Sequence, residues 1–544
     1  MKPASFPSGR RPLPERGAII KEWGGRYPVA LGYPNTYQVG MGNLGFLSIY
    51  SLLNAHPRVV AERFFLSHNR QSKAAAPLET LETRRLVRDA KVIVFSVSFE
   101  KDYLHVVEML QRAGLAVTAA KRRAGDPLVL AGGVATFINP LPLADIVDAF
   151  LLGEGETQVL QVMDQLLANQ QADKEEVLSL LAGVEGVFVP DQTGSGKGCP
   201  PAPVSVAKCR DVDRFVPVSA VSTLAGTSPL SASCLLEINR GCPRGCRFCA
   251  AGFVYRPFRN RSLARLQEVF SAAMDDGHGH FGLVGSALGD YPQLKQLCSW
   301  LVEKKATFSP SSLRLDTLDK ELLELLQAGG VRSVAVAPEA GSQRLRQMIH
   351  KQLHEEQIVA GTRLAAENGI YQVKLYFLIG LPSETDNDLE AIVTLVDLIR
   401  KTMLDSRRSR QKSIRLSVSI NPFIPKPHTP LQWAPFDDLA RLRWKQHYLA
   451  GALRRLGNVS VEMENVLDAA WQAMISRGDR EIGSLLQRLA GQPDSRRRMI
   501  REAVKTNPSL FAARPLNVSL PWSFMAQETS TDVLVHLYHQ SCGA

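Results

Sequence analysis

Long apolar runs are missing from this 544-residue chain, and no stretch approaches the roughly 20 apolar residues that a membrane-spanning helix requires. The first residues also lack an apolar segment of the secretory type. We therefore expect a cytoplasmic protein with no membrane span. Hydrophobic residues still make up 45% of the chain, which suffices for the cores of roughly two to four domains.

Cysteine is scarce, with eight residues in the whole chain and none before Cys199. So few thiols exclude a disulfide scaffold and suit a reducing compartment. The N-terminal region has no thiols for a metal cluster of its own. After Cys249 only Cys298 and Cys542 remain, too scattered for a second cluster. One cluster is the expected number.

The net charge of +11 leaves an anionic partner open. The basic runs, however, are not interleaved with aromatic residues as in a stacking platform for single-stranded nucleic acid. Solvated surface charge is the simpler interpretation. We expect an unknown small-molecule substrate in preference to RNA.

Three cysteines are grouped closely in the run Gly241-Cys-Pro-Arg-Gly-Cys-Arg-Phe-Cys-Ala250. Three thiolates can hold three irons of a [4Fe–4S] cube and leave the fourth iron without a protein ligand. An open metal position is a place for chemistry. A structural zinc site needs a fourth Cys or His nearby, and none lies between Cys249 and His278.

The region from about 26 to 181 alternates short apolar runs with amphipathic stretches, which predicts a Rossmann-like parallel sheet covered by helices on both faces. The expected strands are Pro28–Tyr33, Lys91–Val97, Pro127–Ala131 and Ile146–Leu152. Ligands of such sheets bind beyond the carboxyl ends of the strands. Those ends carry Ser96, Ser98, Gly132, Gly133 and Gly153. The alternative is that these glycines only turn the chain from strand to helix.

From Cys234 the alternation resumes, and six strand–helix units predict a partial (β/α)6 barrel of the TIM type. The expected strands are Cys234–Ile238, His280–Val284, Ser312–Leu315, Ser333–Ala337, Val373–Ile379 and Arg415–Ile420. A helix is expected at Leu318–Ala328, ended by Gly329-Gly330. The three-cysteine run follows the first strand, where such barrels place their chemistry. Ser460–Glu464 is a possible further strand.

These patterns divide the chain into four parts. We expect a Rossmann-like domain at 1–185, a linker at 186–232, the barrel at 233–436 and a mostly helical C-terminal domain at 437–544. The fold class is therefore α/β.

The spacing and setting of the cysteine run resemble the radical S-adenosylmethionine (SAM) superfamily. The resemblance implies that Cys242, Cys246 and Cys249 hold a [4Fe–4S] cluster whose open iron is chelated by the amino and carboxylate groups of SAM. It further implies cleavage of SAM to methionine and a 5′-deoxyadenosyl radical, with an electron donor such as flavodoxin or ferredoxin.

The same resemblance extends to residues on the other barrel strands. Phe248 stands where the family has an aromatic beside adenine, and Gly285 and Ser286 stand where backbone carbonyls receive the SAM amino group, without the common Gly-Gly-Glu form. Glu339 is placed to accept ribose hydroxyls, or it is a carboxylate at a helix entry. Leu378 and Gly380 resemble a segment that packs on adenine, or they are a core strand and its turn.

For two further groups of residues, the sequence allows either a functional or a purely structural role. Arg256, Arg259 and Arg261 follow the cysteines and either bind the SAM carboxylate or an acidic substrate, or are solvated. His428 and Trp433, in a proline-rich segment, more simply pin the C-terminal domain.

The whole chain resembles the cobalamin-binding-domain type of radical SAM protein, closest to an uncharacterised bacterial group that shares Tyr255-Arg-Pro and Pro425-Lys-Pro-His-Thr-Pro. That type implies cobalamin at Ser96, Ser98, Gly132, Gly133 and Gly153. The Asp-x-His-x-x-Gly sequence of stand-alone cobalamin modules is missing here. Its absence predicts cobalt without a His ligand, or a domain that has lost the cofactor.

We therefore expect a radical SAM enzyme, with cobalamin-dependent methyl transfer to an unactivated carbon as the favoured reaction. One alternative is modification of RNA, such as methylthiolation, which requires a second N-terminal cluster. The other is a non-catalytic Fe–S sensor or RNA-binding protein, which has no need of Glu339 or of the segment around Gly380.

Overall fold

The computed structural model describes residues 15–66, 77–190, 202–216, 221–222, 233–407 and 413–543, so most of the expected linker lies outside the described residues. The chain forms two compact units. The first comprises Met1–Leu236, Gly478–Ile500 and Ser519–Gln527, and the second comprises Glu237–Arg477, Arg501–Val518 and Glu528–Ala544. The C-terminal part of the chain thus contributes to both units. In the described part of the chain, no helix is long and apolar enough to cross a membrane.

A six-stranded sheet forms the centre of the first unit, in the order β3-β2-β4-β5-β6-β7. Its strands are β2 Tyr27–Tyr33, β3 Val59–Phe65, β4 Val92–Ser96, β5 Leu128–Gly132, β6 Ala149–Leu151 and β7 Val187–Phe188. Only β7 runs antiparallel to its neighbour. The four predicted strands are confirmed to within a few residues, and the Rossmann-like character of the unit with them.

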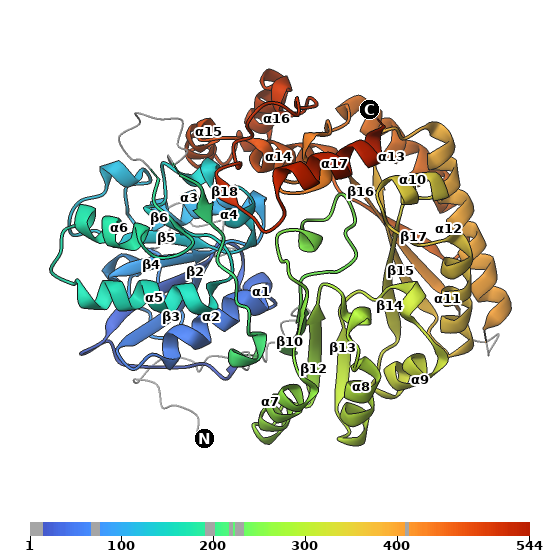
Figure 1. The fold of residues 1–544 in the computed structure, drawn as a ribbon, viewed down its shortest axis with the longest axis horizontal. Coiled ribbons are helices and arrows are strands. Elements are labelled where there is room, and N and C mark those ends of the chain that lie inside the picture. Colours follow the sequence, from blue (N-terminus) through green and yellow to red (C-terminus); the bar gives the residue numbers. More distant parts are fainter. Residues whose placement is uncertain are drawn as a thin grey trace. The chain divides into compact units, whose positions relative to one another are not determined.

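Helices cover both faces of this sheet (Figure 1). One face packs against α2 Leu44–Ala55, α5 Gly155–Ala168 and α6 Lys174–Ala182, which share one apolar core with β2 and β4. The other helices of the unit are α1 Tyr37–Gly40, α3 Tyr103–Arg112, α4 Val134–Ile138 and, from the C-terminal region, α15 Glu481–Ala490. Two short strand pairs complete it: β1 Glu15–Arg16 with β9 Val221–Ser222, and β8 Val204–Ser205 with β18 Met525–Ala526.

Strand β3 was not expected from the sequence, because its centre carries two charged residues. Arg63 is fully buried and its Nε donates to Glu82 Oε1 at 2.7 Å. Glu62, also buried, accepts from Thr80 Oγ1 at 2.5 Å. Buried charges are tolerated only when paired in this way. The partners lie 18 and 19 residues from β3 in sequence, so the local pattern did not reveal this buried edge strand.

The second unit contains two four-stranded sheets that together make the partial barrel. The first has the order β11-β10-β12-β13, and the second has the order β14-β15-β16-β17. The strands are β10 Cys234–Arg240, β11 Arg259–Asn260, β12 His280–Gly285, β13 Thr307–Pro310, β14 Ser333–Glu339, β15 Gln372–Ile379, β16 Arg415–Pro422 and β17 Val459–Met463. Their register is parallel within the second sheet and between β12 and β13, whereas β11 is antiparallel to β10.

Alternation along the strands decides which face meets the helices. In β15 the residues Val373, Leu375 and Phe377 are at most 2% exposed, whereas Lys374 and Tyr376 between them are partly exposed. Figure 1 shows α11 and α12 along one face of this sheet. The helices of the unit are α7 Leu263–Asp275, α8 Leu294–Glu303, α9 Lys320–Ala328, α10 Gln343–Met348, α11 Glu355–Glu367, α12 Asp386–Ser406, α13 Leu439–Arg454, α14 Val466–Arg477 and α17 Thr531–Cys542; α16 Arg496–Thr506 has residues in both units.

Two details of the barrel differ from expectation. The prediction of a strand at Ser312–Leu315 is wrong. The strand there, β13, is Thr307–Pro310, and Leu315–Thr317 is a short turn of 3₁₀-helix. Leu313 and Leu315 are apolar because they are buried in the loop after the strand. The possible strand at Ser460–Glu464 is real, and as β17 it extends the parallel sheet beyond the six expected strands.

The local signals at α9 are confirmed in the structure. Leu322, Leu323 and Leu326 are buried on one face, and the helix ends at Ala328 with Gly329 as its C-cap. It begins at Lys320 because the Asp319 side chain accepts from the Leu322 amide.

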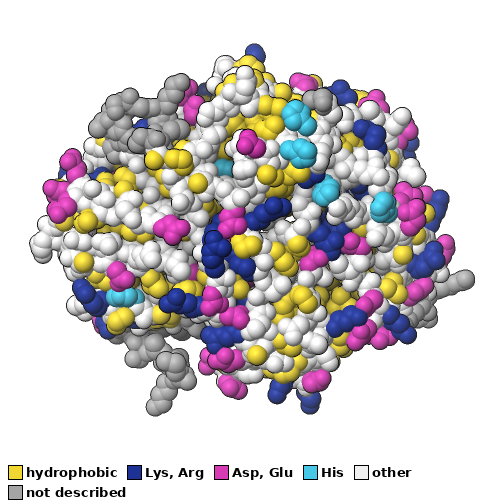
Figure 2. All heavy atoms as spheres, in the orientation of Figure 1, with side chains coloured by type: hydrophobic (Ala, Val, Ile, Leu, Met, Phe, Trp, Pro, Cys, Tyr) yellow, Lys and Arg dark blue, Asp and Glu magenta, His cyan; other side chains and the backbone are white. Residues whose placement is uncertain are grey.

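On the face that Figure 2 shows, acidic and basic side chains are interspersed.

A substitution at Gly133 can test how tightly the loops at the end of the first sheet are packed. Its φ of +102° and ψ of 167° belong to a region open only to glycine, and an added Cβ would lie 2.5 Å from the Val97 carbonyl oxygen. We expect Gly133→Ala to destabilise this unit by about 3 kcal/mol. Hydrogen exchange of peptides from β4 and β5 in a urea series measures the loss.

Gly125→Ala is the matched control, because a Cβ there meets no atom within 4 Å. It should change the free energy of unfolding by no more than about 0.5 kcal/mol. Equal effects of the two substitutions would contradict the packing interpretation.

Candidate active site

The three-cysteine loop follows β10 and is shaped by two glycines. Gly241 has a φ of +80°, and a Cβ there would lie 2.4 Å from the Tyr255 carbonyl oxygen. Gly245 has a φ of +67°. The Cys249 amide donates to the Cys246 carbonyl at 3.1 Å, which closes a turn between these two cysteines. The backbone therefore folds the loop tightly around the positions of the thiols.

The thiols themselves are close enough to influence one another. Cys246 is buried, and Cys242 and Cys249 are partly buried. Burial, with the charge of Cys246 next in importance, raises the pKa of Cys249 to about 11. Burial also raises the pKa of Cys246, where Lys351 acts in the opposite direction. The surroundings of Cys246 and Cys249 thus disfavour their thiolates unless a metal binds them.

This donor set fits a cluster better than a single ion. Within the described ranges, no three Cys, His, Asp or Glu side chains are grouped closely enough to hold one metal ion. A [4Fe–4S] cube does not require such a group, because each thiolate ligates a different iron. All three cysteines are free of disulfides. Cys242, Cys246 and Cys249 are therefore the residues that can hold the cube.

Two arginines fix the surroundings of the loop. Arg244, between the first two cysteines, donates through Nε to Asp290 Oδ2 at 3.1 Å. Arg314 forms a two-bond pair with Asp316, at 2.9 and 2.8 Å, and also donates to the Lys351 carbonyl at 3.3 Å. Both arginines are ion-paired, which fixes the positions of their guanidinium groups beside the loop.

The arginines after the loop are engaged in the local structure. Arg256 Nε donates to the Gly252 carbonyl at 2.7 Å, and Arg259 Nε donates to the Pro257 carbonyl at 2.9 Å. Arg261 is buried and donates to Glu237 Oε2 at 2.5 Å. Each of the three arginines thus has a partner in the local structure, although Nε and Nη1 of Arg261 are buried without a hydrogen-bond partner.

Glu339 ends β14 beside a lysine that the sequence analysis did not single out. Lys351 Nζ lies 3.3 Å from Glu339 Oε1. Burial raises the pKa of Glu339, and Lys351 partly offsets this. Lys351 sits between His350 and Gln352, which have φ of +54° and +46°, a conformation that costs energy in residues other than glycine. A strained turn thus presents one ammonium to the carboxylate and to the cysteine loop.

Gly285 and Ser286 lie at the end of β12, next to β10. An added Cβ at Gly285 would lie 2.4 Å from Asn239 Oδ1. Asn239 Nδ2 donates to the Ala287 carbonyl at 2.8 Å, and Ser311 Oγ donates to the Gly285 carbonyl at 2.8 Å. Asn239, also missed from the sequence, therefore fixes this stretch of backbone against the strand that carries the cysteines.

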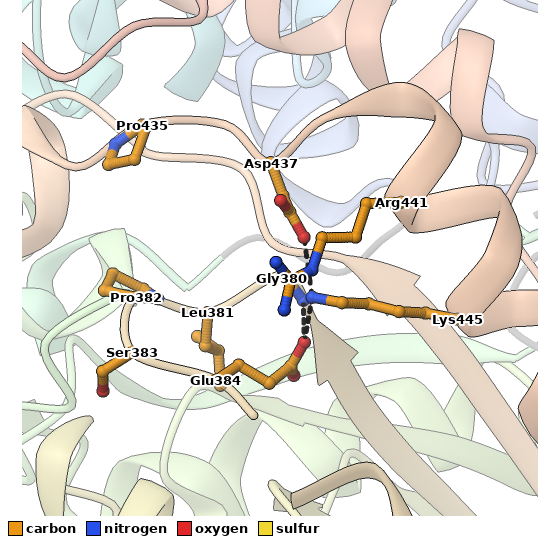
Figure 3. Close-up of a pocket in the computed structure, with 9 residues that line it drawn as sticks. All are labelled: Gly380, Leu381, Pro382, Ser383, Glu384, Pro435, Asp437, Arg441 and Lys445. Atoms are coloured by element: carbon orange, nitrogen blue, oxygen red, sulfur yellow. Dashed lines mark hydrogen bonds and ion pairs between the residues drawn. The ribbon is translucent and has the colours of Figure 1, made fainter. Parts of the chain in front are cut away.

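Phe248 and Leu378 are brought together, although 130 residues separate them. Both pack against one apolar cluster, which contains Ile349 and Leu381. Gly380 follows with a φ of +80°, and its amide donates to Glu384 Oε2 at 2.8 Å. The loop after β15 lines a pocket of about 210 Å³, shown in Figure 3.

The expected strand-end residues of the first unit also lie along one edge. Ser96 pairs with Gly132 at the ends of β4 and β5. At Gly153, with a φ of +117°, a Cβ would lie 2.2 Å from the Ala207 carbonyl oxygen. Close backbone packing accounts for glycine at positions 133 and 153 whether or not a ligand is present.

Polar side chains gather where the strand order reverses, between β2 and β4. Asn35 Nδ2 donates to Asp102 Oδ1 at 2.9 Å, and His105 Nδ1 lies 3.1 Å from the same oxygen. Asn43 Nδ2 donates to Ser98 Oγ at 3.0 Å. A reversal of strand order is the usual place for a ligand in a sheet of this type. The sequence analysis found only Ser98 of this group.

The pair of His105 and Asp102 gives a pH dependence. Burial lowers the pKa of His105, but the hydrogen bond and charge of Asp102 raise it more, so the net direction is upward. A raised pKa contributes stability below the unfolded value near 6.5, and this contribution is lost as pH rises through the folded value. The cost of His105→Gln in unfolding free energy should therefore be larger at about pH 5.5 than at about pH 9.

Urea titrations of both proteins at the two pH values measure this difference. In an Asp102→Asn background, the same His105→Gln substitution should lose most of its pH dependence. A cost that is the same at both pH values in the native background would show that the pair does not titrate as described.

Comparisons with known proteins bear on both units. Residues 45–190 match a family model described as the N-terminal region of radical SAM proteins, and residues 236–396 match the model of the radical SAM superfamily. An uncharacterised protein of Methanocaldococcus jannaschii is 30% identical over 461 residues, which cover 84% of this chain and 90% of that one. An uncharacterised methyltransferase of Pyrococcus horikoshii is 23% identical over 49% of this chain and 56% of its own length.

Solved structures show the same fold. The radical SAM methyltransferase TsrM of Kitasatospora setae, solved with cobalamin and a [4Fe–4S] cluster, is 15% identical, with a TM-score of 0.52 over 75% of this chain and 74% of that chain. The cobalamin-dependent radical SAM enzyme OxsB, solved with aqua-cobalamin and SAM, is 13% identical, with a TM-score of 0.50 over 95% of this chain and 79% of that chain. With the sequence matches, these findings show that the chain belongs to the radical SAM superfamily.

Proposed function

We propose that this protein cleaves SAM reductively at a [4Fe–4S] cluster held by Cys242, Cys246 and Cys249. The observation that carries the proposal is the grouping of three mutually interacting thiols on one tightly turned loop. When bound and reduced, the cluster supplies the electron that cleaves SAM to methionine and a 5′-deoxyadenosyl radical. A one-electron donor such as flavodoxin or ferredoxin would reduce it.

The chain's own residues would bind and orient SAM around that loop. Phe248 and Leu378 offer an apolar wall for adenine, since both belong to one cluster. Glu339 is a hydrogen-bond acceptor for ribose hydroxyls, and Lys351 beside it is a cation for the SAM carboxylate. The fixed backbone at Gly285 and Ser286 would receive the amino group.

We further propose that the product radical is used for cobalamin-dependent methyl transfer to an unactivated carbon. The fold shared with TsrM and OxsB supports this, as do the polar strand ends of the first unit. Cobalamin, when bound, would supply the methyl group. Ser96, Ser98, Gly132, Gly133 and Gly153 line the edge where it would sit.

Substitution of the three cysteines tests the cluster. After anaerobic reconstitution, the wild type should bind about four irons, give an EPR signal on reduction that changes when SAM is added, and release 5′-deoxyadenosine. The variant Cys242→Ala/Cys246→Ala/Cys249→Ala should lose all three properties, because it removes all three proposed ligands of the cluster. Lys351→Met should keep the cluster signal but need roughly tenfold more SAM to perturb it.

Cys298→Ala is the matched control, since this buried thiol lies on α8, away from the cysteine loop in sequence. It should keep iron content and SAM cleavage. Cleavage of SAM by the triple variant would refute the assignment of the ligands.

Cobalamin binding has its own test. Reconstituted protein incubated with hydroxocobalamin and passed through a desalting column should retain roughly one corrinoid per chain by absorbance. Ser98→Tyr should reduce retention by about tenfold or more without changing the iron content, because it fills the strand-end edge. Equal retention by the two proteins would argue for a different cobalamin site.

A further inference from the structure

A polar pocket opens at the end of β15, between the loop Gly380–Glu384 and the start of α13 (Figure 3). Its volume is about 210 Å³. The lining residues are Gly380, Leu381, Pro382, Ser383, Glu384, Pro435, Asp437, Arg441 and Lys445. Four of these side chains carry charge, so the chemistry of the pocket depends on which charges are already paired.

A buried ammonium forms ion pairs with both carboxylates of the pocket. Lys445 is 2% exposed, and its Nζ lies 2.5 Å from Glu384 Oε2 and 2.6 Å from Asp437 Oδ2. The Gly380 amide also donates to Glu384. One lysine thus ties the β15 loop to the segment before α13. Both carboxylates of the pocket are ion-paired with this one ammonium.

Among the described residues, Arg441 is the charged side chain of the pocket that makes no ion pair. It lies on α13, between Asp437 and Lys445 at spacings of four residues, and its side chain is exposed. Figure 3 shows its guanidinium extending into the pocket. Among the residues that the structure describes, no carboxylate lies within ion-pair distance of it. A planar guanidinium in this position suits a carboxylate or phosphate, which it can contact through two parallel hydrogen bonds.

The size of the pocket limits what can enter. Sites that enclose a whole small molecule usually measure about 300–1,000 Å³. A cavity of about 210 Å³ is smaller, and it is open on one side, so it accommodates one functional group and leaves the rest of a ligand outside. An apolar group would bury Arg441 without a partner, which is unfavourable.

We propose that this pocket binds an anionic group, a carboxylate or a phosphate, of the substrate, with Arg441 as the recognising residue. The identification of the bound anion as part of the substrate rests on the proposed function, whereas anion binding by the pocket does not. Because Gly380 lines the pocket and Leu378 belongs to the apolar wall described above, the anionic group would be anchored at the same end of β15 as SAM. The substrate class is then an organic acid or a phosphate ester.

Binding of simple anions to the full-length reconstituted protein tests this at constant ionic strength. Inorganic phosphate is followed by ³¹P line broadening, and acetate by ¹H saturation transfer. We expect at least one of the two to bind the wild type in the low millimolar range, and Arg441→Gln to weaken that binding about tenfold or more. The stronger anion indicates whether the natural group is a phosphate or a carboxylate.

Arg443→Gln is the matched control, because Arg443 is exposed on the same helix but does not line the pocket. It should change the affinity by less than about twofold. Equal effects at positions 441 and 443, or no binding of either anion by the folded wild type, would overturn the proposal. If the reconstituted wild type binds the anion but does not cleave SAM, that result would count against the proposed function and not against anion binding.

Discussion

Three cysteine sulfurs held together in a partly buried loop face an electrostatic conflict, and much of the second unit is arranged around it. Burial and the neighbouring cysteine charges raise the pKa of Cys246 and of Cys249, which favours the protonated form of these two thiols. Metal ligation requires thiolates, so cluster binding and proton release are coupled. The charges of Lys351 and Arg314 favour the thiolate of Cys246, whereas Glu339 opposes it. The strained turn around Lys351 is understandable as the means of keeping that charge in place.

The architecture could be predicted to a large extent because strands and helices leave local periodic patterns. The four strands expected in the first sheet and five of the six expected in the barrel are found at their predicted places. The exceptions have physical causes. Strand β3 hides behind buried charges that are paired with distant residues, and the residues mistaken for β13 are apolar because a loop is buried there.

The candidate site was predictable only where residues of the right chemical type lie close together in sequence or at the ends of predicted strands. The cysteines are within one loop, and residues at strand ends gather because parallel strands end at one edge. Lys351, Asn239 and Lys445 carried no such signal, since their partners lie 12, 48 and 61 residues away. A lone lysine or asparagine in a sequence is ordinary, and only the folded chain shows that a buried carboxylate or carbonyl depends on it.

The C-terminal part of the chain supplies pieces to both compact units, with Gly478–Ile500 and Ser519–Gln527 in the first and Arg501–Val518 and Glu528–Ala544 in the second. Strand β18 of this part even pairs with β8, some 320 residues earlier in the chain. During synthesis on the ribosome, the first unit therefore stays incomplete until Gln527 has emerged. Neither unit can be detached by a single cut, so gene fusion or exchange of one half during evolution would leave both halves damaged.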